Sequence, residues 1–384
     1  MIFFEIYNQS FNDSNLSSRV WDNSSMFLYF VVILITLVLG RVAERSNRRQ
    51  NIGNNVKGVL IIVACFLTAI LGFRGQLVGM DTPQYRENFE QALSPNAWKY
   101  SDMEPGYMLS NILLRCLFSS GQFYIFFISA ITVCLALNCI WSFRSQINLF
   151  WSFAFLVGAY YFQALNLARI YLAASIIMWG LYYLIDGKVR KFIFVVLFAS
   201  TLHYSSLIML LPVGFMWLYK KTRLVAILSV VAAIFAMIPL SAVFSDYIVI
   251  ARYAAYGDSN ESTSGLGLAL LVDYSPCFFC LYYIYKYKIK GQWADIMVAM
   301  TILAFFIRMI AYYIAIAGRL GVHFMLLYVI LLPYFVNNMR INKRMEYKPF
   351  VLFLFVFLLM KIHMYFIGYL ASDGIMPYYF FWNE

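Results

Sequence analysis

Long apolar runs separated by short polar segments constrain the fold of this chain more than any other feature. A helix needs ~20 apolar residues to cross a bilayer, and no run alternates like the strand of a membrane barrel. Only 12% of the residues are charged and 63% are hydrophobic, far from a soluble domain. We therefore expect an all-α polytopic membrane protein, one transmembrane domain over 1–384 with about twelve crossings. The runs lie near 25–43, 58–74, 122–142, 148–165, 168–186, 190–202, 205–219, 223–243, 266–286, 293–316, 320–337 and 349–370.

Residues 105–118 interrupt this pattern. They begin at Pro105, carry Asn111 and Arg115, and are too short to span. We expect a re-entrant or interfacial helix here. The segment 75–121 then forms an external loop that holds this helix and an amphipathic one, and 244–265 forms a second external loop.

The distribution of basic residues sets the expected orientation. Most of the 29 lysines and arginines fall in loops that share one side when 105–118 does not cross. By the positive-inside rule this side is cytoplasmic. The net charge of +11 is therefore a topology signal, and no nucleic-acid partner is expected. The basic loops are 41–57, 143–147, 187–191, 220–223, 286–290 and 338–348.

The same topology gathers polar residues on the opposite, external face. Two runs that are short for a crossing, 190–202 and 205–219, meet at His203, so its imidazole is expected below the membrane surface. The residues expected at the external ends of helices are Asp81, Arg169, His203, Arg252 and Arg319.

The stretch "FRGQLVGMDTPQYRENFE" at 73–90 follows the second apolar run. Thr82 and Pro83 suit the N-cap and first position of a helix. Tyr85, Phe89 and Ala92 then fall on one face, which can lie on the membrane domain. Asp81 is either part of a capped turn or a carboxylate aimed at a cavity, and the residues alone leave both open. Arg74 is expected to clamp Asp81 or the loop.

Arg169 and His203 each have a structural alternative. Arg169 starts an apolar helix, where a guanidinium must snorkel, pair or face a wet cavity. Asn166, three residues earlier, is expected on the same helical face and favours a polar pocket. His203 is flanked by serines and threonines, so a hydrogen-bonded structural histidine stays open. His323 and His363 are expected to be structural.

Two further arginines belong to the external face. Arg319 stands between Gly318 and Gly321, which permit a tight turn, while Arg252 could equally be a solvated loop charge. Arginine forks suit phosphate oxygens, so an anionic lipid-linked phosphate is a natural ligand. The chain has no carboxylate-rich or His-x-x-x-His cluster, so we expect no metal.

Six motifs follow one another along the chain: "FRGQLVGMDTPQY", "EPGYMLSNILLR" from Glu104, "NLARIYLAASIIMWGLYYL", "KFIFVVLFASTLHYSSLIMLLP", "RYAAY" and "GRLGVHF". In this order they resemble the EpsG family, the Wzy-like bacterial O-antigen, capsule and exopolysaccharide polymerases. They cover most of the chain, from about 57 to 335. The family often has Arg-Gln where this chain has Arg169 and Ile170, so a polar partner is missing there.

The resemblance implies a GT-C-like glycosyltransferase of the bacterial inner membrane, active on the periplasmic or external face. It would transfer a glycan from undecaprenyl diphosphate to the terminal sugar of another lipid-linked repeat. Donor, acceptor and membrane lipid are the implied partners, with a chain-length regulator by analogy.

The residue inventory fits this chemistry without a metal or cofactor. Arginines can neutralise the diphosphate leaving group, and the acceptor hydroxyl needs a base. His203 is expected as base with Asp81 as orienter, although these two roles could be reversed. The diphosphate ligands are Arg169, Arg252 and Arg319, and the supporting residues are Arg74, Thr82, Tyr85, Glu104 and Asn166.

Two other functions use similar features. An O-antigen ligase would take the same donor but transfer the glycan to the lipid A core. A lipid-linked oligosaccharide flippase or transporter would also be polytopic. Transporters often contain internal repeats with broken helices in corresponding positions, and this sequence has no such repeat.

Overall fold

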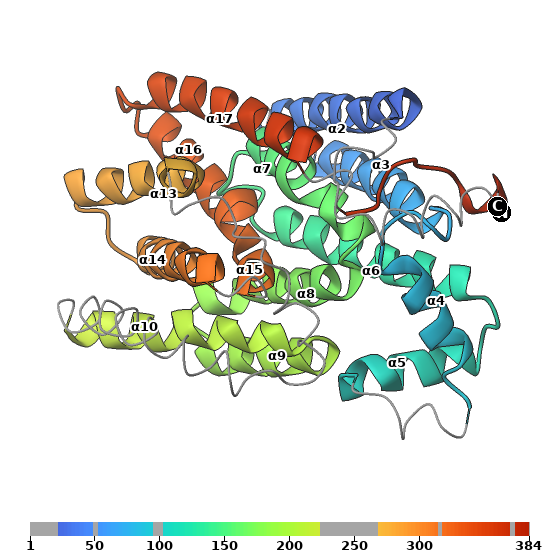
Figure 1. Cartoon of the computed structure of the whole chain (residues 1–384). Helices are drawn as coiled ribbons and strands as arrows, with labels where there is room; N and C mark the ends of the chain where they lie inside the picture. The colour runs from blue at the N-terminus through green and yellow to red at the C-terminus, as the bar shows by residue number, and fades with distance from the viewer. Residues whose placement is uncertain are drawn as a thin grey trace.

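The computed structural model describes residues 22–48, 53–94, 103–222, 268–313, 317–368 and 373–383. Within these ranges the chain is helical, and its one isolated β-bridge joins Arg74 to Phe380. Figure 1 shows the helices packed side by side in a single bundle. An all-helical membrane architecture was expected, and the described part of the chain confirms it.

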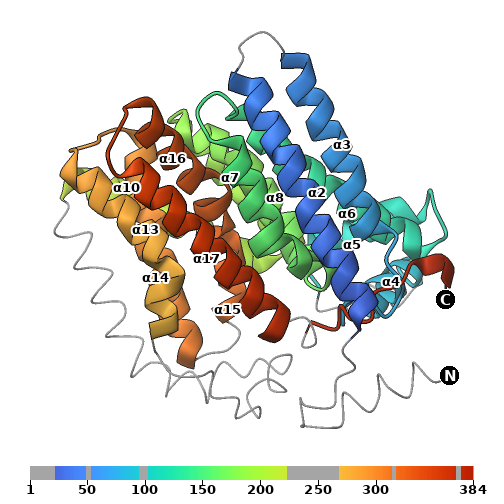
Figure 2. The same cartoon turned by 90° about the horizontal axis from the view of Figure 1, so that it is seen from above.

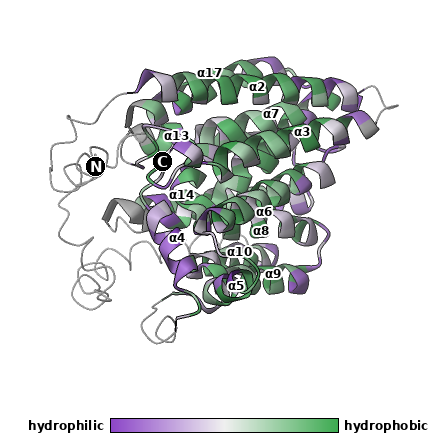
Figure 3. Ribbon diagram, turned by 90° about the vertical axis from the view of Figure 1, so that its right-hand side faces the viewer, coloured by the Kyte–Doolittle hydropathy of each residue, from purple (hydrophilic) through white to green (hydrophobic). Residues whose placement is uncertain are grey.

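Seven helical segments are long and apolar enough to cross a membrane. Figure 3 shows hydrophobic residues along most of their length, with hydrophilic residues toward the helix ends and on α4. The expected count of about twelve crossings is not confirmed, and the run 223–243 lies outside the described residues. The seven are α2 (Asn23–Arg48), α3 (Gly53–Gly72), α6 (Gly121–Ser142), α8 (Ala168–Ile185), α14 (Gln292–Tyr313), α17 (Tyr347–Gly368) and the composite segment Gly321–Ile341.

Shorter helices complete the bundle. The expected short pair around His203 is present, because α9 ends at Leu202 and the next helical segment starts at Tyr204. The remaining elements are α4 (Thr82–Glu90), α5 (Pro105–Arg115), α7 (Leu149–Phe155), η2 (Leu156–Tyr160), η3 (Tyr161–Leu165), α9 (Val189–Leu202), η4 (Tyr204–Met209), α10 (Leu210–Lys221), α15 (Ala317–Leu320), η8 (Phe381–Asn383) and the longer α13 (Leu268–Lys286). The composite segment consists of η6 (Gly321–Met325), η7 (Leu327–Leu331) and α16 (Leu332–Ile341).

Helix α8 lies at the centre of the bundle and packs against α6 and α9. Small residues allow this close approach, which is how membrane helices associate without a hydrophobic driving force. Ala173 and Ala174 are fully buried. A Cβ at Gly180 would stand only 2.6 Å from Val195 of α9. The packing of α8 therefore fixes the position of Arg169 in its first turn.

The basic loops meet at one end of the bundle, here called the basic end. Arg340 Nη1 lies 3.3 Å from Glu44 Oε1, and Asn47 Nδ2 donates to the carbonyl of Arg144 at 2.6 Å. Lys220 and Lys286 join the same end through Asp295 and Glu346, respectively. Loops expected on one side of the membrane are thus neighbours in space.

Helices α4 and α5 lie with the C-terminal segment at the opposite end of the bundle, here called the site end (Figure 2). Helix α5 has 11 residues, about 16 Å of length, which is too short to span. It packs against α4 and α9. This agrees with a helix that does not cross, while its depth in the lipid stays a prediction.

Candidate functional site

The loop between α3 and α4 belongs to the stretch 73–90, and its structure explains why two of its positions are glycines. Gly79 has φ +87, and a Cβ there would lie 2.2 Å from the carbonyl oxygen of Leu165. A Cβ at Gly75 would collide with the ring of Tyr379 at 2.0 Å. Glycine is the residue that permits both approaches. The motif therefore shapes a loop that fits under neighbouring backbone.

Arg74 holds this loop rather than Asp81. Its guanidinium is fully buried, and it donates to Thr82 Oγ1 at 3.1 Å and to the carbonyl of Leu71 at 2.5 Å. Burial lowers the pKa of Arg74 to about 10, so it remains charged at neutral pH. Arg74 was expected to hold either Asp81 or the loop, and its hydrogen bonds join the two ends of the loop.

Helix α4 begins one residue earlier than the sequence indicated. Asp81 occupies the N-cap and Thr82 is the first helical residue, with proline next. The expected N-cap role of Thr82 is wrong, because its hydroxyl donates to the carbonyl of Val78 at 2.7 Å. The expected apolar face is confirmed, since Tyr85, Phe89 and Ala92 are all buried.

Asp81 lies at the rim of the site end. Its backbone N–H donates to Asn166 Oδ1 at 3.1 Å, and its carboxylate accepts from the Tyr85 hydroxyl at 3.2 Å. Asn166 does not share a helical face with Arg169, because α8 begins only at Ala168. The irregular segment η3 ends just before Asn166 and turns its amide toward Asp81.

The central feature of the site is a carboxylate that joins a cation to an imidazole. Glu104 Oε2 accepts from Arg169 Nη1 at 3.0 Å. Glu104 Oε1 lies 2.7 Å from His203 Nδ1. The three side chains are only 4%, 13% and 16% exposed for Glu104, Arg169 and His203. This triad unites residues from three motifs that are far apart in the sequence.

Glu104 is ionised in this arrangement. Burial alone would raise its pKa, but the hydrogen bond with His203 and the charge of Arg169 outweigh burial and lower the pKa to about 2. An ionised carboxylate can only accept hydrogen bonds. His203 therefore donates its Nδ1 proton to Glu104, and in the neutral form of the imidazole Nε2 is the proton acceptor.

Two tyrosines enclose Arg169. Its Cζ lies 4.7 Å from the ring centroid of Tyr107 and 5.5 Å from that of Tyr85. Such aromatic faces attract a guanidinium and hold its plane. Tyr85 also donates to Asp81, so it connects the Asp81 loop to the triad. The polar groups form one continuous site.

The C-terminal segment adds a residue that the sequence reasoning missed. Asp373 follows α17, and its carboxylate accepts from the Tyr365 hydroxyl at 3.1 Å. Backbone bonds place it beside the Asp81 loop: Gly79 N–H donates to the carbonyl of Gly374 at 2.8 Å and Met80 N–H to that of Asp373 at 3.3 Å. The sequence signal that could have indicated Asp373 is a carboxylate placed shortly after the last apolar run.

Several groups of this site shift the pKa of Asp373. Burial and, less strongly, the charge of Asp81 raise its pKa, whereas hydrogen bonds with Tyr365 and Asn166 and the charge of Arg319 lower it, and the net result is a pKa of about 6. The charge of Arg319 therefore acts on Asp373 of this site. Arg252 and the loop 244–265 lie outside the described residues, so their expected roles stay predictions.

His323 is buried next to the triad. It is 0% exposed, and its Nε2 lies 2.7 Å from Ser205 Oγ, two residues after His203. This fits the structural role expected for it. Among the described residues no group of three or more His, Cys, Asp or Glu side chains could hold a metal ion.

Comparison with known proteins gives one positive result. No curated protein and no solved structure matches the chain. A family model, described as the EpsG family, matches residues 57–380. The match covers most of the chain and includes every residue of the triad and both aspartates of the site. This membrane-embedded chain therefore belongs to the EpsG family, a family of the polysaccharide-polymerase type.

Proposed function

We propose that the chain is a polysaccharide polymerase that transfers a glycan from undecaprenyl diphosphate to the terminal sugar of another lipid-linked repeat. The observation that carries this proposal is the Glu104 bridge between Arg169 and His203 at the site end. A cation for a diphosphate and an oriented imidazole for a hydroxyl are the two groups this transfer needs. Family membership supports the same reaction class.

His203 acts as the base in this mechanism. Its Nε2 takes the proton of the acceptor hydroxyl while Nδ1 remains bonded to Glu104. The acceptor oxygen then attacks the anomeric carbon of the donor glycan. The bond from that carbon to the diphosphate oxygen breaks, and its electron pair leaves with undecaprenyl diphosphate. Glu104 is a positioning residue that fixes the tautomer of His203.

Positive charge assists the departure of the diphosphate. Arg169 stands at the start of α8, enclosed by aromatic rings, and the charge of Arg319 acts on Asp373. Preorganised cations of this kind stabilise charge that develops on the leaving group without a metal. Arg252 belongs to the same proposed set. Asp81 orients the acceptor sugar through its carboxylate.

The proposal includes the placement of the protein. About twelve crossings in a GT-C-like arrangement would put the basic end in the cytoplasm and the site end on the periplasmic face of a bacterial inner membrane. The positive-inside rule supports this orientation. Repeat units exported across the membrane then reach the site, and a chain-length regulator would act on the same face.

Purified protein with lipid-diphosphate repeat units tests the reaction directly. We expect a ladder of lengthened glycans on a gel, with elongation lost in His203→Ala and reduced in Asp81→Ala. Glycan found only on an added lipid A core would indicate a ligase instead. Repeat units accumulating on the inner leaflet of a deletion strain would indicate flipping. Unchanged ladders for both variants would contradict the mechanism.

Asp373→Asn should change how stability depends on pH. The folded pKa of about 6 lies above the ordinary value, so the stabilising contribution is complete below about pH 4 and is lost as pH rises through 6. The neutral amide of asparagine avoids that loss. A shift of about two pKa units corresponds to a loss of up to about 3 kcal/mol of unfolding free energy. We expect the unfolding temperature of Asp373→Asn to exceed that of the wild type at pH 8 but not at pH 5.

The matched control for this measurement is Asp186→Asn. Asp186 pairs with Lys188 at the basic end and its side chain is 44% exposed. Thermal unfolding of both variants in nanodiscs at the two pH values provides the comparison. A difference between Asp373→Asn and wild type that stays constant from pH 5 to pH 8 would refute the burial of a charged Asp373.

A further inference from the structure

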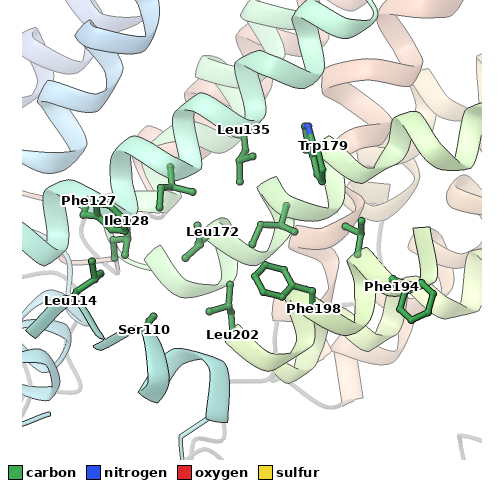
Figure 4. A pocket seen from close by; sticks show the side chains of 13 residues that line it. Ser110, Leu114, Phe127, Ile128, Leu135, Leu172, Trp179, Phe194, Phe198 and Leu202 are labelled. Atoms are coloured by element: carbon green, nitrogen blue, oxygen red, sulfur yellow. The ribbon is translucent and has the colours of Figure 1, made fainter. Parts of the chain in front are cut away.

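An apolar groove runs along the surface of the bundle beside the triad. Its walls come from α5, α6, α8 and α9, and its volume is about 480 Å³, within the range of small-ligand pockets. Figure 4 shows the side chains that line it, nearly all hydrocarbon, with Ser110 at one end and Trp179 and Phe194 toward the other.

Arg169 stands at the head of the wall that α8 contributes. Leu172, Ile176 and Trp179 line the groove and follow Arg169 at i+3, i+7 and i+10. These spacings place all four on one face of the helix. At 1.5 Å per residue the stripe extends about 15 Å from the guanidinium. Arg169, whose guanidinium is paired with Glu104, therefore lies just beyond one end of this apolar wall.

The other walls end at the same place. Phe194, Phe198 and Leu202 line the groove from α9, and His203 follows Leu202 directly. Helix α5 packs closely on the end of α9 and so closes the head of the groove. A Cβ at Gly106 of α5 would lie only 2.2 Å from the Thr201 hydroxyl of α9. Both residues that bind Glu104 thus mark the head of this groove.

The lip of the groove is open sideways. Phe194 is 71% exposed and Phe198 is 60% exposed, both on α9. A ligand could enter from the bilayer without leaving hydrocarbon. A single hydrocarbon chain whose phosphate head reaches the guanidinium fork of Arg169 matches this arrangement, whereas a phospholipid must place two chains.

We propose that this groove holds the isoprenoid chain of the lipid-linked substrate, with its diphosphate at Arg169. The assignment rests on the proposed function, since it names where the donor of that reaction binds. The hydrocarbon chain would be fixed along α8 while the diphosphate–sugar bond lies against His203. Binding energy from the chain, remote from the reacting atoms, would then position the glycan for transfer.

Photo-crosslinking tests the groove without requiring any turnover. The full-length protein in nanodiscs would receive an isoprenyl diphosphate with a benzophenone at its far end. We expect cross-links on groove residues of α8 and α9, competed at least tenfold better by unlabelled polyprenyl diphosphate than by phosphatidylglycerol. Equal competition by phosphatidylglycerol would show a site for bulk lipid only and would overturn the proposal.

A filled groove should also be selective for the length of the lipid. Leu135 lines the groove from α6, and Leu135→Trp should raise KM at least tenfold for an undecaprenyl-linked donor. Activity on a donor with a two-isoprene tail should be unchanged. Leu197→Trp is the matched control, because Leu197 of α9 is 43% exposed and does not line the groove. An equal KM change for both donor lengths would count against the groove.

The two proposals fail in different ways. If the wild type lengthens no glycan but the cross-links are competed selectively, the polymerase reaction is wrong and the groove stands. If glycans lengthen normally while cross-links scatter over all outward-facing helices, the groove is wrong and the reaction stands.

Discussion

His203→Ala is expected to lower the rate of glycan transfer by about 10²–10⁴-fold, the usual contribution of a positioned general base. The imidazole is held through Nδ1 by Glu104 at 2.7 Å, and no other imidazole of the described site is placed to replace it, since His323 is engaged with Ser205. Initial rates with purified lipid-diphosphate repeat units measure the loss. Added imidazole should restore part of the activity.

His363→Ala is the matched control. His363 is exposed on α17, away from the triad, so its variant should transfer glycan at the wild-type rate. Glu104→Gln should cost less than His203→Ala, and combining both should add little, because Glu104 acts through the imidazole. A His203→Ala rate within threefold of wild type would rule out His203 as the base.

The sequence predicted the helical membrane fold and the end of the bundle at which the site residues lie, because both depend on local composition. Apolar run lengths predict helices, and charge asymmetry predicts which helix ends share a face. This was sufficient to bring Asp81, Arg169 and His203 to one end. The bundle also brings the basic loops together at the other end, as Glu44 and Arg340 illustrate.

Pairings within the site could not be predicted in the same way. Glu104 was a supporting residue of a motif, and nothing in its surroundings indicates that it joins Arg169 to His203. Asp373 reaches the Asp81 loop only because the C-terminal segment folds back against Gly79 and Met80. Contacts between residues almost 300 positions apart leave no local periodicity to detect.

Backbone irregularity explains the remaining differences. Asn166 was expected on the helical face of Arg169, but the π-helical and 3₁₀ segments before it end the preceding helix and α8 starts anew at Ala168. Irregular helical turns of this kind often accompany functional sites. At the Asp81 loop, Thr82 does not cap α4, because its hydroxyl accepts from Arg74 Nε and donates to the carbonyl of Val78.

Arg169→Ala is expected to lower kcat/KM for the lipid-diphosphate donor by about 10²–10³-fold, comparable to removing one preorganised donor from a leaving-group site. The change removes the cation at the head of the groove. It also leaves the buried carboxylate of Glu104, 4% exposed, paired with His203. The pKa of Glu104 should rise, because one of the groups that lower it is lost.

Arg169→Lys separates charge from geometry. A lysine keeps the positive charge but loses the planar fork that can bind Glu104 and phosphate together. We expect activity between those of Arg169→Ala and wild type. Arg144→Ala is the control, because Arg144 covers the Trp141 ring at the basic end and should not affect transfer. Protein levels in isolated membranes must match before rates are compared.

The outcome also tests whether the arginine serves chemistry or only the fold. A purely structural ion pair would make Arg169→Ala unstable yet leave kcat/KM per folded molecule unchanged. A diphosphate ligand would instead lose donor affinity while the thermal unfolding of Arg169→Lys stays near wild type. Because Arg169 contacts Glu104 and heads the α8 wall of the groove, the same substitution should weaken both glycan transfer and cross-linking of the isoprenyl diphosphate. Loss of one without the other would separate the base site from the lipid site.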